Sequence, residues 1–152
     1  MWDDLREQIT VEREQLRHLQ DVRRPLLERC AARPPDRIEL SALAAMLHSL
    51  YGGIEDIFKR STLELGDRLP AGHSWHKDLL DSMATPGRDR GPLISAELKS
   101  RLTDYMEFRH FFRHSYVFVL EWDRMKPLVL GCEETLRQLE VELDAFLGRR
   151  EK

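Results

Sequence analysis

The sequence has few cysteines, no long apolar run and no large excess of charge of one sign. Only Cys30 and Cys132 occur among its 152 residues, far apart and without a CxxC spacing. We therefore expect two reduced, packed thiols and no disulfide, redox or zinc site. No stretch approaches the roughly 18 apolar residues that a membrane-spanning helix requires, so no membrane contact is expected.

The charge balance is slightly acidic, with 24 Lys and Arg residues against 27 Asp and Glu residues and a net charge of −3. A protein that coats nucleic acid broadly is basic, so that class is excluded and any contact with nucleic acid must be local. Met1–Leu5 is acidic and lacks the basic and apolar segments of a signal peptide. We therefore expect a cytoplasmic protein, and the length predicts one domain over residues 1–152.

Strand patterns are nearly absent. The one β-like run, Val117–Leu120, is too short and isolated to build a sheet. Apolar residues recur instead at spacings of three and four, which indicates amphipathic helices. The predicted helices are a long one through residue 30 that Pro25 should kink or split, one over 38–65, a short one capped by Ser74, one from about Ser95 and one from about Asp123. The pattern predicts an all-α bundle of four or five helices.

Two adjacent glycines lie in the middle of the second predicted helix. Gly52 and Gly53 each cost about 1 kcal/mol relative to alanine at such a position. Two explanations remain open: another helix packs closely against this point, or a ligand or a partner backbone needs access to it.

The densest cluster of reactive side chains lies at 107–116. This segment holds two arginines, two histidines and a tyrosine among three phenylalanines, and the stretch 99–116 is locally positive. A histidine can accept a proton from a ribose 2′-hydroxyl or donate one to the leaving 5′-oxygen. An arginine can bind the phosphate and stabilise the charge of the transition state. These residue types suit phosphodiester chemistry that needs no metal.

Helix geometry limits how these side chains can cooperate. Arg109, Arg113 and Tyr116 share one helical face, whereas His110 and His114 share another. On a continuous helix Arg109 and His114 would diverge by about 140°. A working Arg–His pair therefore requires a helix break at this point or a second chain, as in a homodimer.

Two plainer interpretations of the segment remain open. An Arg, His and Phe-rich helix end can be a packed aromatic face with solvated charges. The pairs His110/His114 and His73/His76 have spacings that suit metal chelation, but neither has a third ligand at a characteristic spacing. We therefore expect no metal and no other cofactor.

Arg109, His114 and Tyr116 fit the R-x4-H-x-Y signature of HEPN-domain ribonucleases, and the chain resembles the HepT toxin family in particular. The motif precedes the last helix of a small all-α chain, as it does in that family. Three further stretches are similar to HepT-like proteins: 51–60, 74–80 and 122–128.

This resemblance implies a HEPN-type fold and a metal-independent endoribonuclease centre at a homodimer interface. Arg109 and His114 would be its catalytic residues, with His110 and Arg113 supporting the site. The resemblance also implies a type II or type VII-like toxin–antitoxin system. A minimal nucleotidyltransferase antitoxin would transfer AMP onto Tyr116 and block the ribonuclease, because the added charge and bulk would lie where the RNA phosphate binds.

The sequence departs from the commonest family members between the arginine and the histidine. Phe111, Phe112 and Arg113 stand where small or aliphatic residues are usual, which fits a HepT-like subgroup. The alternative function is a non-catalytic helical partner or substrate-binding subunit of a nucleotidyltransferase. A structural bundle that carries the motif by accident is a third.

Overall fold

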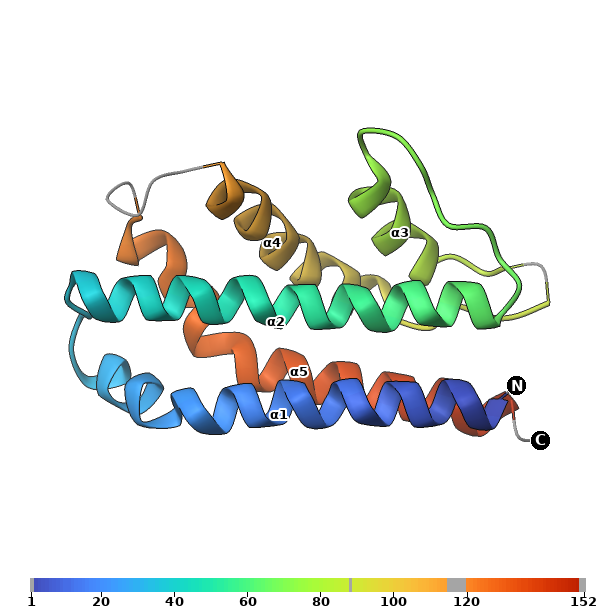
Figure 1. Cartoon of the computed structure of the whole chain (residues 1–152), viewed down its shortest axis with the longest axis horizontal. Helices are drawn as coiled ribbons and strands as arrows, with labels where there is room; N and C mark the ends of the chain where they lie inside the picture. Colours follow the sequence, from blue (N-terminus) through green and yellow to red (C-terminus); the bar gives the residue numbers. More distant parts are fainter. Residues whose placement is uncertain (1, 88, 115–119, 151–152) are drawn as a thin grey trace.

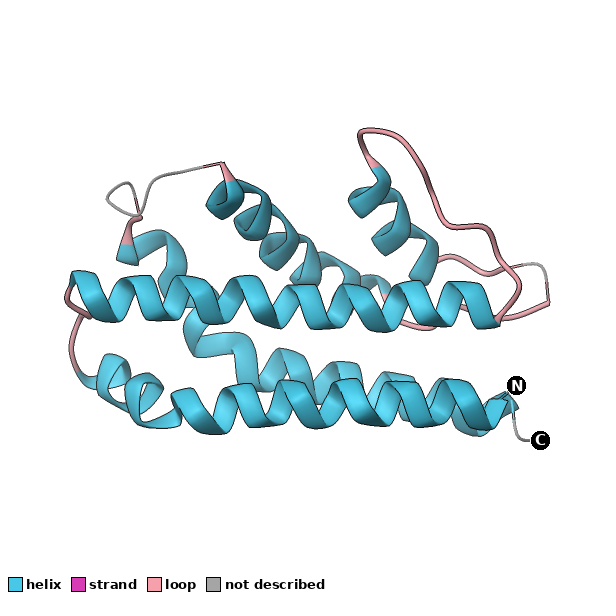
Figure 2. Cartoon of the chain, viewed as in Figure 1, coloured by secondary structure: helices cyan, strands magenta, loops and turns pink. Residues whose placement is uncertain are grey.

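The computed structural model describes residues 2–87, 89–114 and 120–150 and is helical throughout its regular segments. These ranges contain five helices and no strand (Figures 1 and 2). The helices are α1 (Trp2–Ala32), α2 (Arg37–Glu64), α3 (Trp75–Met83), α4 (Ala96–Arg113) and α5 (Trp122–Arg150). The predicted all-α bundle is confirmed. Of the β-like run, only Leu120 lies within the described residues.

Helix α2 is the centre of the bundle and contacts every other helix. It forms an antiparallel hairpin with α1, and α5 packs against both (Figure 1). The helices α3 and α4 pack on α2 and on each other, away from α1. The predicted apolar stripe of α2 is fully buried, from Leu43 to Ile57. The middle of α2 therefore lies where side chains from several helices can meet.

Local sequence signals explain most helix ends. Asp36 caps α2 in a capping box, in which its side chain accepts from the Glu39 N–H and the Glu39 side chain accepts from the Asp36 N–H. Ser95 caps α4 by accepting a hydrogen bond from the Leu98 N–H. Ser74 occupies the N-cap position of α3 but makes no side-chain capping bond, so that part of the prediction is wrong. Pro25 does not split α1, which continues to Ala32.

The two cysteines are buried in the core and unpaired, as expected. Burial raises the pKa of the Cys132 thiol to about 11, and that of Cys30 is also raised, chiefly by burial. Both thiols are therefore protonated and unreactive at neutral pH.

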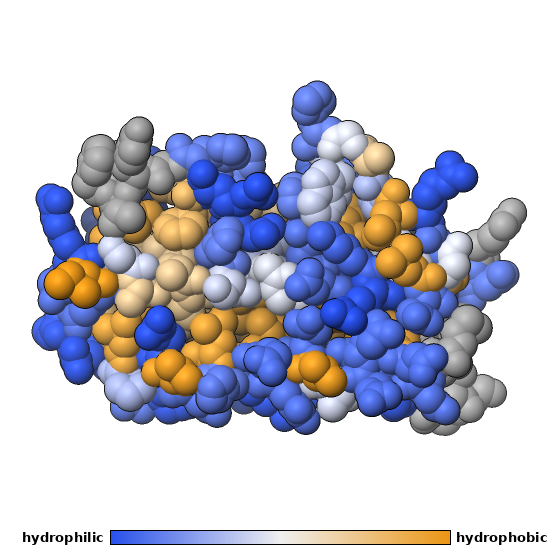
Figure 3. All heavy atoms as spheres, in the orientation of Figure 1, coloured by the Kyte–Doolittle hydropathy of each residue, from blue (hydrophilic) through white to orange (hydrophobic). Residues whose placement is uncertain are grey.

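The visible face of the molecule is mainly hydrophilic, with small scattered apolar patches (Figure 3). On the surface, ion pairs join α1 to α5, including Arg13–Asp144 at 2.7 Å and Arg17–Glu140 at 2.7 Å. Exposed pairs of this kind contribute little stability each, about 0–1 kcal/mol. None of the helices in the described ranges is long and apolar enough to cross a membrane.

Candidate active site

A buried carboxylate joins three helices near the middle of α2. Glu55 is only 3% exposed. Its Oε1 accepts a hydrogen bond from Nη1 of Arg109 on α4 at 3.1 Å, and its Oε2 lies 2.7 Å from Nδ1 of His76 on α3. Burying a carboxylate is costly unless its charge is paired and its oxygens are hydrogen-bonded. The two partners meet that requirement and fix the arginine and the histidine relative to each other.

The two glycines of α2 have different surroundings. A Cβ added at Gly53 would lie 2.6 Å from Cδ2 of Leu16, so α1 packs too closely there for a side chain. This confirms the expected close approach of another helix. A Cβ at Gly52 would meet Arg109 Nε at 3.8 Å, which is an ordinary contact. The Arg109 side chain thus lies next to a bare stretch of α2 backbone.

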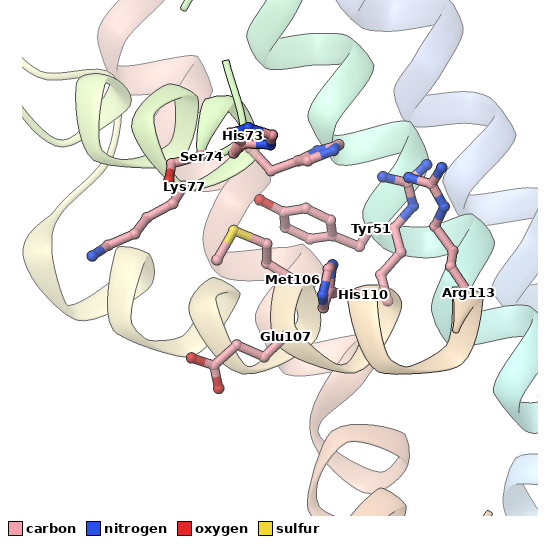
Figure 4. A pocket seen from close by; sticks show the side chains of 10 residues that line it. Tyr51, His73, Ser74, Lys77, Met106, Glu107, His110 and Arg113 are labelled. Atoms are coloured by element: carbon pink, nitrogen blue, oxygen red, sulfur yellow. The ribbon is translucent and has the colours of Figure 1, made fainter. Parts of the chain in front are cut away.

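A cleft of about 270 Å³ opens beside Glu55 and its partners Arg109 and His76. It lies between α2, α4 and the start of α3 (Figure 4). Tyr51, Met106 and His110 lie together at its centre, whereas Lys77 and Glu107 point away from the Tyr51 ring. The residues that line the cleft are Tyr51, His73, Ser74, His76, Lys77, Met106, Glu107, Arg109, His110 and Arg113. Burial, and then the negative charge of Glu55, raises the pKa of Tyr51, so this hydroxyl stays protonated.

The predicted site residues fall into two groups. Arg109, His110 and Arg113 line the one cleft. His114 is exposed and its ring contacts that of His110, with a centroid distance of 4.7 Å. No hydrogen bond joins Arg109 to His114 in the described part of the chain. Tyr116 lies outside the described residues.

The end of helix α4 comes too late to bring Arg109 and His114 of one chain together. Helix α4 ends at Arg113, and His114 is its C-cap, with φ −113° and ψ 13°. The His114 N–H still bonds to the carbonyls of the last turn, so the chain leaves the helix only after this residue. His114 is therefore on the exposed rim beside His110, while Arg109 is on the buried side of the cleft.

The aromatic side chains of the motif are partly structural. The rings of Phe108 and Phe112 stack with centroids 6.1 Å apart, and both pack against the core. Phe111, in contrast, is 39% exposed. The packed-face interpretation is thus right for two of the three phenylalanines and does not account for the cleft.

The surroundings of His48 are positively charged. Burial, and then the positive charges of Arg109 and Arg113, lower its pKa. Among the described residues, its Nδ1 and the Nε of Arg109 are both buried without a hydrogen-bond partner, and Arg113 forms no ion pair. Unpaired donors and excess positive charge suit an anion such as a phosphate.

Sequence reasoning missed Glu55 and Tyr51 as members of the site, and it considered His76 only as a metal ligand. Their best signal was a polar residue beside the apolar stripe: Glu55 follows Tyr51 by four residues and so shares its helical face. In the described ranges, no three or more His, Cys, Asp or Glu side chains are grouped so that they could hold a metal ion.

Five helices in this order, with the R-x4-H motif at the end of α4, define an all-α bundle of the HEPN type. A family model described as HepT-like protein matches residues 42–149. The chain therefore belongs to the HepT-like family, a family of HEPN-type toxins, as the motif resemblance implied. The matched range includes Glu55, His76 and Arg109. Comparison with curated proteins and with solved structures gave no match.

Proposed function

We propose that this chain is the toxin of a type II or type VII-like toxin–antitoxin system and acts as a metal-independent endoribonuclease. The observation that carries the proposal is the placement of Arg109. Glu55 holds it, its Nε is buried without a hydrogen-bond partner in the described ranges, and it shares a cleft with His110 and Arg113. A guanidinium fixed in this way is preorganised to bind a phosphodiester and to stabilise its transition state.

The histidines of the motif take part in the proton transfers of the proposed reaction. Cleavage by the ribose 2′-hydroxyl needs one group that accepts a proton and one that donates a proton to the leaving 5′-oxygen. The rings of His110 and His114 contact each other, and His110 lines the cleft in which an RNA strand would bind. Such general acid–base catalysis, together with the arginine, requires no metal.

A homodimer is the second part of the proposal. His114 is exposed and, among the described residues, no hydrogen bond joins it to Arg109 of its own chain, so its partner arginine would come from a second copy. The exposed Phe111 lies between them in sequence and would be covered at such an interface. Each dimer would then hold two composite sites.

Control by a nucleotidyltransferase antitoxin is the third part. The antitoxin would transfer AMP from ATP onto Tyr116, two residues after His114. The family membership and the intact motif support this part of the proposal. A phosphodiester-linked nucleotide there would compete with RNA for the arginines of the cleft.

The deciding experiment is induction of the chain alone in bacteria, beside His114→Ala. We expect growth arrest and RNA cleavage with the wild type only, since removing a proton-transfer group lowers a rate by about 10²–10⁴. His18→Ala, at an exposed position on α1, is the matched control and should stay toxic. Equal toxicity of His114→Ala would refute its catalytic role. Intact RNA with the wild type, and no adduct on Tyr116 by mass spectrometry, would favour the non-catalytic subunit.

Mixing two inactive variants tests the composite site. In a heterodimer of Arg109→Ala and His114→Ala chains, one site keeps both groups and the other keeps neither. Random exchange should therefore restore about a quarter of the wild-type sites. A mixture that stays inactive, although size-exclusion chromatography shows heterodimers, would mean that both residues act within one chain.

Tyr116→Phe tests the regulation separately. This variant should cleave RNA as the wild type does but should escape the antitoxin, because the acceptor hydroxyl is gone. Mass spectrometry after incubation with antitoxin and ATP provides the measurement. A variant that is still modified and silenced would exclude Tyr116 as the control point.

A further inference from the structure

The cleft contains a histidine that lies outside the R-x4-H-x-Y motif and is held far more firmly than His110 or His114. His76 lies in the first turn of α3 and is mostly buried, with 26% of its side chain exposed. Its Nδ1 is 2.7 Å from Glu55 Oε2. Its ring also contacts that of Trp75, which carries Lys59 Nζ at 4.5 Å above it. The ring is therefore fixed on more than one side.

The bond to Glu55 sets the tautomer of His76. An ionised carboxylate only accepts hydrogen bonds, so Nδ1 must donate to it. In the neutral ring the lone pair then belongs to Nε2, on the opposite edge. Since Nδ1 faces the buried carboxylate while His76 lines the cleft, Nε2 is the edge that faces the cleft. A neutral imidazole in this orientation is ready to accept a proton.

The same carboxylate aligns this base with the group that binds phosphate. Glu55 uses one oxygen for His76 and the other for Arg109, so the imidazole and the guanidinium are one carboxylate apart. A phosphate bound to Arg109 would bring its neighbouring ribose next to the edge of His76. Fixed geometry of this kind is what lowers the entropic cost of catalysis.

We infer that His76 is a catalytic residue of the RNA cleavage, acting as the general base with Glu55 as its orienting partner; this inference rests on the proposed function. Nε2 takes the proton from the ribose 2′-hydroxyl as the 2′-oxygen bonds to phosphorus. The bond from phosphorus to the 5′-oxygen breaks, and that oxygen takes a proton from His110 or His114. The products are a 2′,3′-cyclic phosphate and a 5′-hydroxyl, and Arg109 holds the phosphate throughout.

The test uses His76→Gln and the full-length protein. The glutamine amide can still donate to Glu55, so the fold and the position of Arg109 are kept, but it cannot carry a proton. We expect kcat to fall by about 10²–10⁴ with little change in KM or in melting temperature. His76→Ala should show a similar loss, and added imidazole should restore part of its activity. His18→Gln is the matched control and should keep the wild-type rate.

A substrate with sulfur in place of the bridging 5′-oxygen distinguishes base from acid, since a thiolate leaves without a proton. The substrate is an oligoribonucleotide that spans a mapped cleavage site. The sulfur substitution should restore the cleavage rate of the variant that lacks the proton donor, His110 or His114. Cleavage by His76→Gln should stay slow. Wild-type rates for His76→Gln on the ordinary substrate, or its recovery on the sulfur substrate, would overturn the role of His76 alone. Absence of cleavage by the wild type would overturn the proposed function and this inference with it.

Discussion

Helix α2 carries two buried glutamates that are paired in similar ways but do different things. Glu39 is 8% exposed and binds Arg29 and Arg33, whereas Glu55 is 3% exposed and binds His76 and Arg109. Each of the two carboxylates is therefore paired with two basic side chains. The clusters lie sixteen positions apart on one helix, so their surroundings and partners account for the difference between them.

The partners show what each cluster is for. Glu39 also accepts from the backbone N–H of Asp36, and its arginines come from the end of α1 and the turn that follows. That cluster closes a local turn, and its arginines are about half exposed. Glu55 instead gathers partners from 21 and 54 positions away, and each of them lines the cleft. A buried carboxylate marks a site when its partners present further polar atoms to a cavity.

The largest expected effect is that of Glu55→Ala. It would leave the Arg109 guanidinium half-buried without its partner, and loss of one member of a buried pair costs about 3–5 kcal/mol. The free energy of unfolding from denaturant titration provides the measurement. Glu55→Gln keeps the shape of the side chain and one acceptor oxygen, so its free energy of unfolding should fall less than that of Glu55→Ala. If Glu55→Ala lowered the free energy of unfolding by less than about 1 kcal/mol, the Glu55 cluster would be no stronger than an exposed surface pair. The difference between the Glu55 and Glu39 clusters would then be refuted.

A smaller effect, confined to stability, is expected at Glu39. The hydrogen bonds from Arg33, from the Asp36 backbone and from Arg29 lower the pKa of Glu39 from its ordinary 4.5 to about 2. Because the folded-state pKa is depressed, this stabilisation is complete above pH 4.5 and is lost as the pH falls toward 2. Glu39→Gln should therefore flatten the fall in melting temperature over that range.

RNA cleavage by Glu39→Gln at neutral pH should equal that of the wild type, since none of its partners lines the cleft. Altered cleavage by a well-folded Glu39→Gln protein would contradict the claim that the Glu39 cluster acts on stability alone. An unchanged pH dependence of melting would show that other carboxylates dominate acid unfolding.

The smallest effects are expected at Gly52 and Gly53. Substitutions there test how closely Arg109 packs against α2. Gly52→Ala should stabilise the protein by up to about 1 kcal/mol, because its Cβ meets Arg109 only at an ordinary contact distance. Gly53→Ala should show no gain, since Leu16 must move to make room and overpacking offsets the helix propensity. Denaturant titration of both variants provides the comparison. A destabilised Gly52→Ala protein would mean that Arg109 is packed against α2 more tightly than its distances indicate.

Most of the fold was predictable because its determinants are local. Apolar spacing of three and four located the helices, and Ser95 was a correct start signal for α4. Of the two effects predicted for Pro25, the split does not occur, since one missing backbone hydrogen bond does not outweigh the burial of Leu5, Leu16 and Cys30 on the same helix.

The site was predictable only where it follows a motif. Arg109, His110 and Arg113 are close in sequence, and the structure brings them to one cleft. Glu55 and His76 were not predicted, because a polar residue beside an apolar stripe is usually solvated and nothing local shows that another helix will cover it. Their partnership depends on contacts between distant segments, which the spacing of apolar residues does not specify.

Helix α3 has little of its own to keep it folded. It has nine residues and its N-cap residue Ser74 makes no side-chain capping bond, and helices this short are unstable in isolation. Its amide hydrogens should therefore exchange with solvent through local opening, well before the core of α2 opens. A nucleotide whose phosphate binds Arg109 and whose ribose hydroxyl donates to Nε2 of His76 would bind the closed form only and would slow this exchange by mass action. The exchange rate of the α3 amides thus measures occupancy of the cleft, even where no RNA is cut.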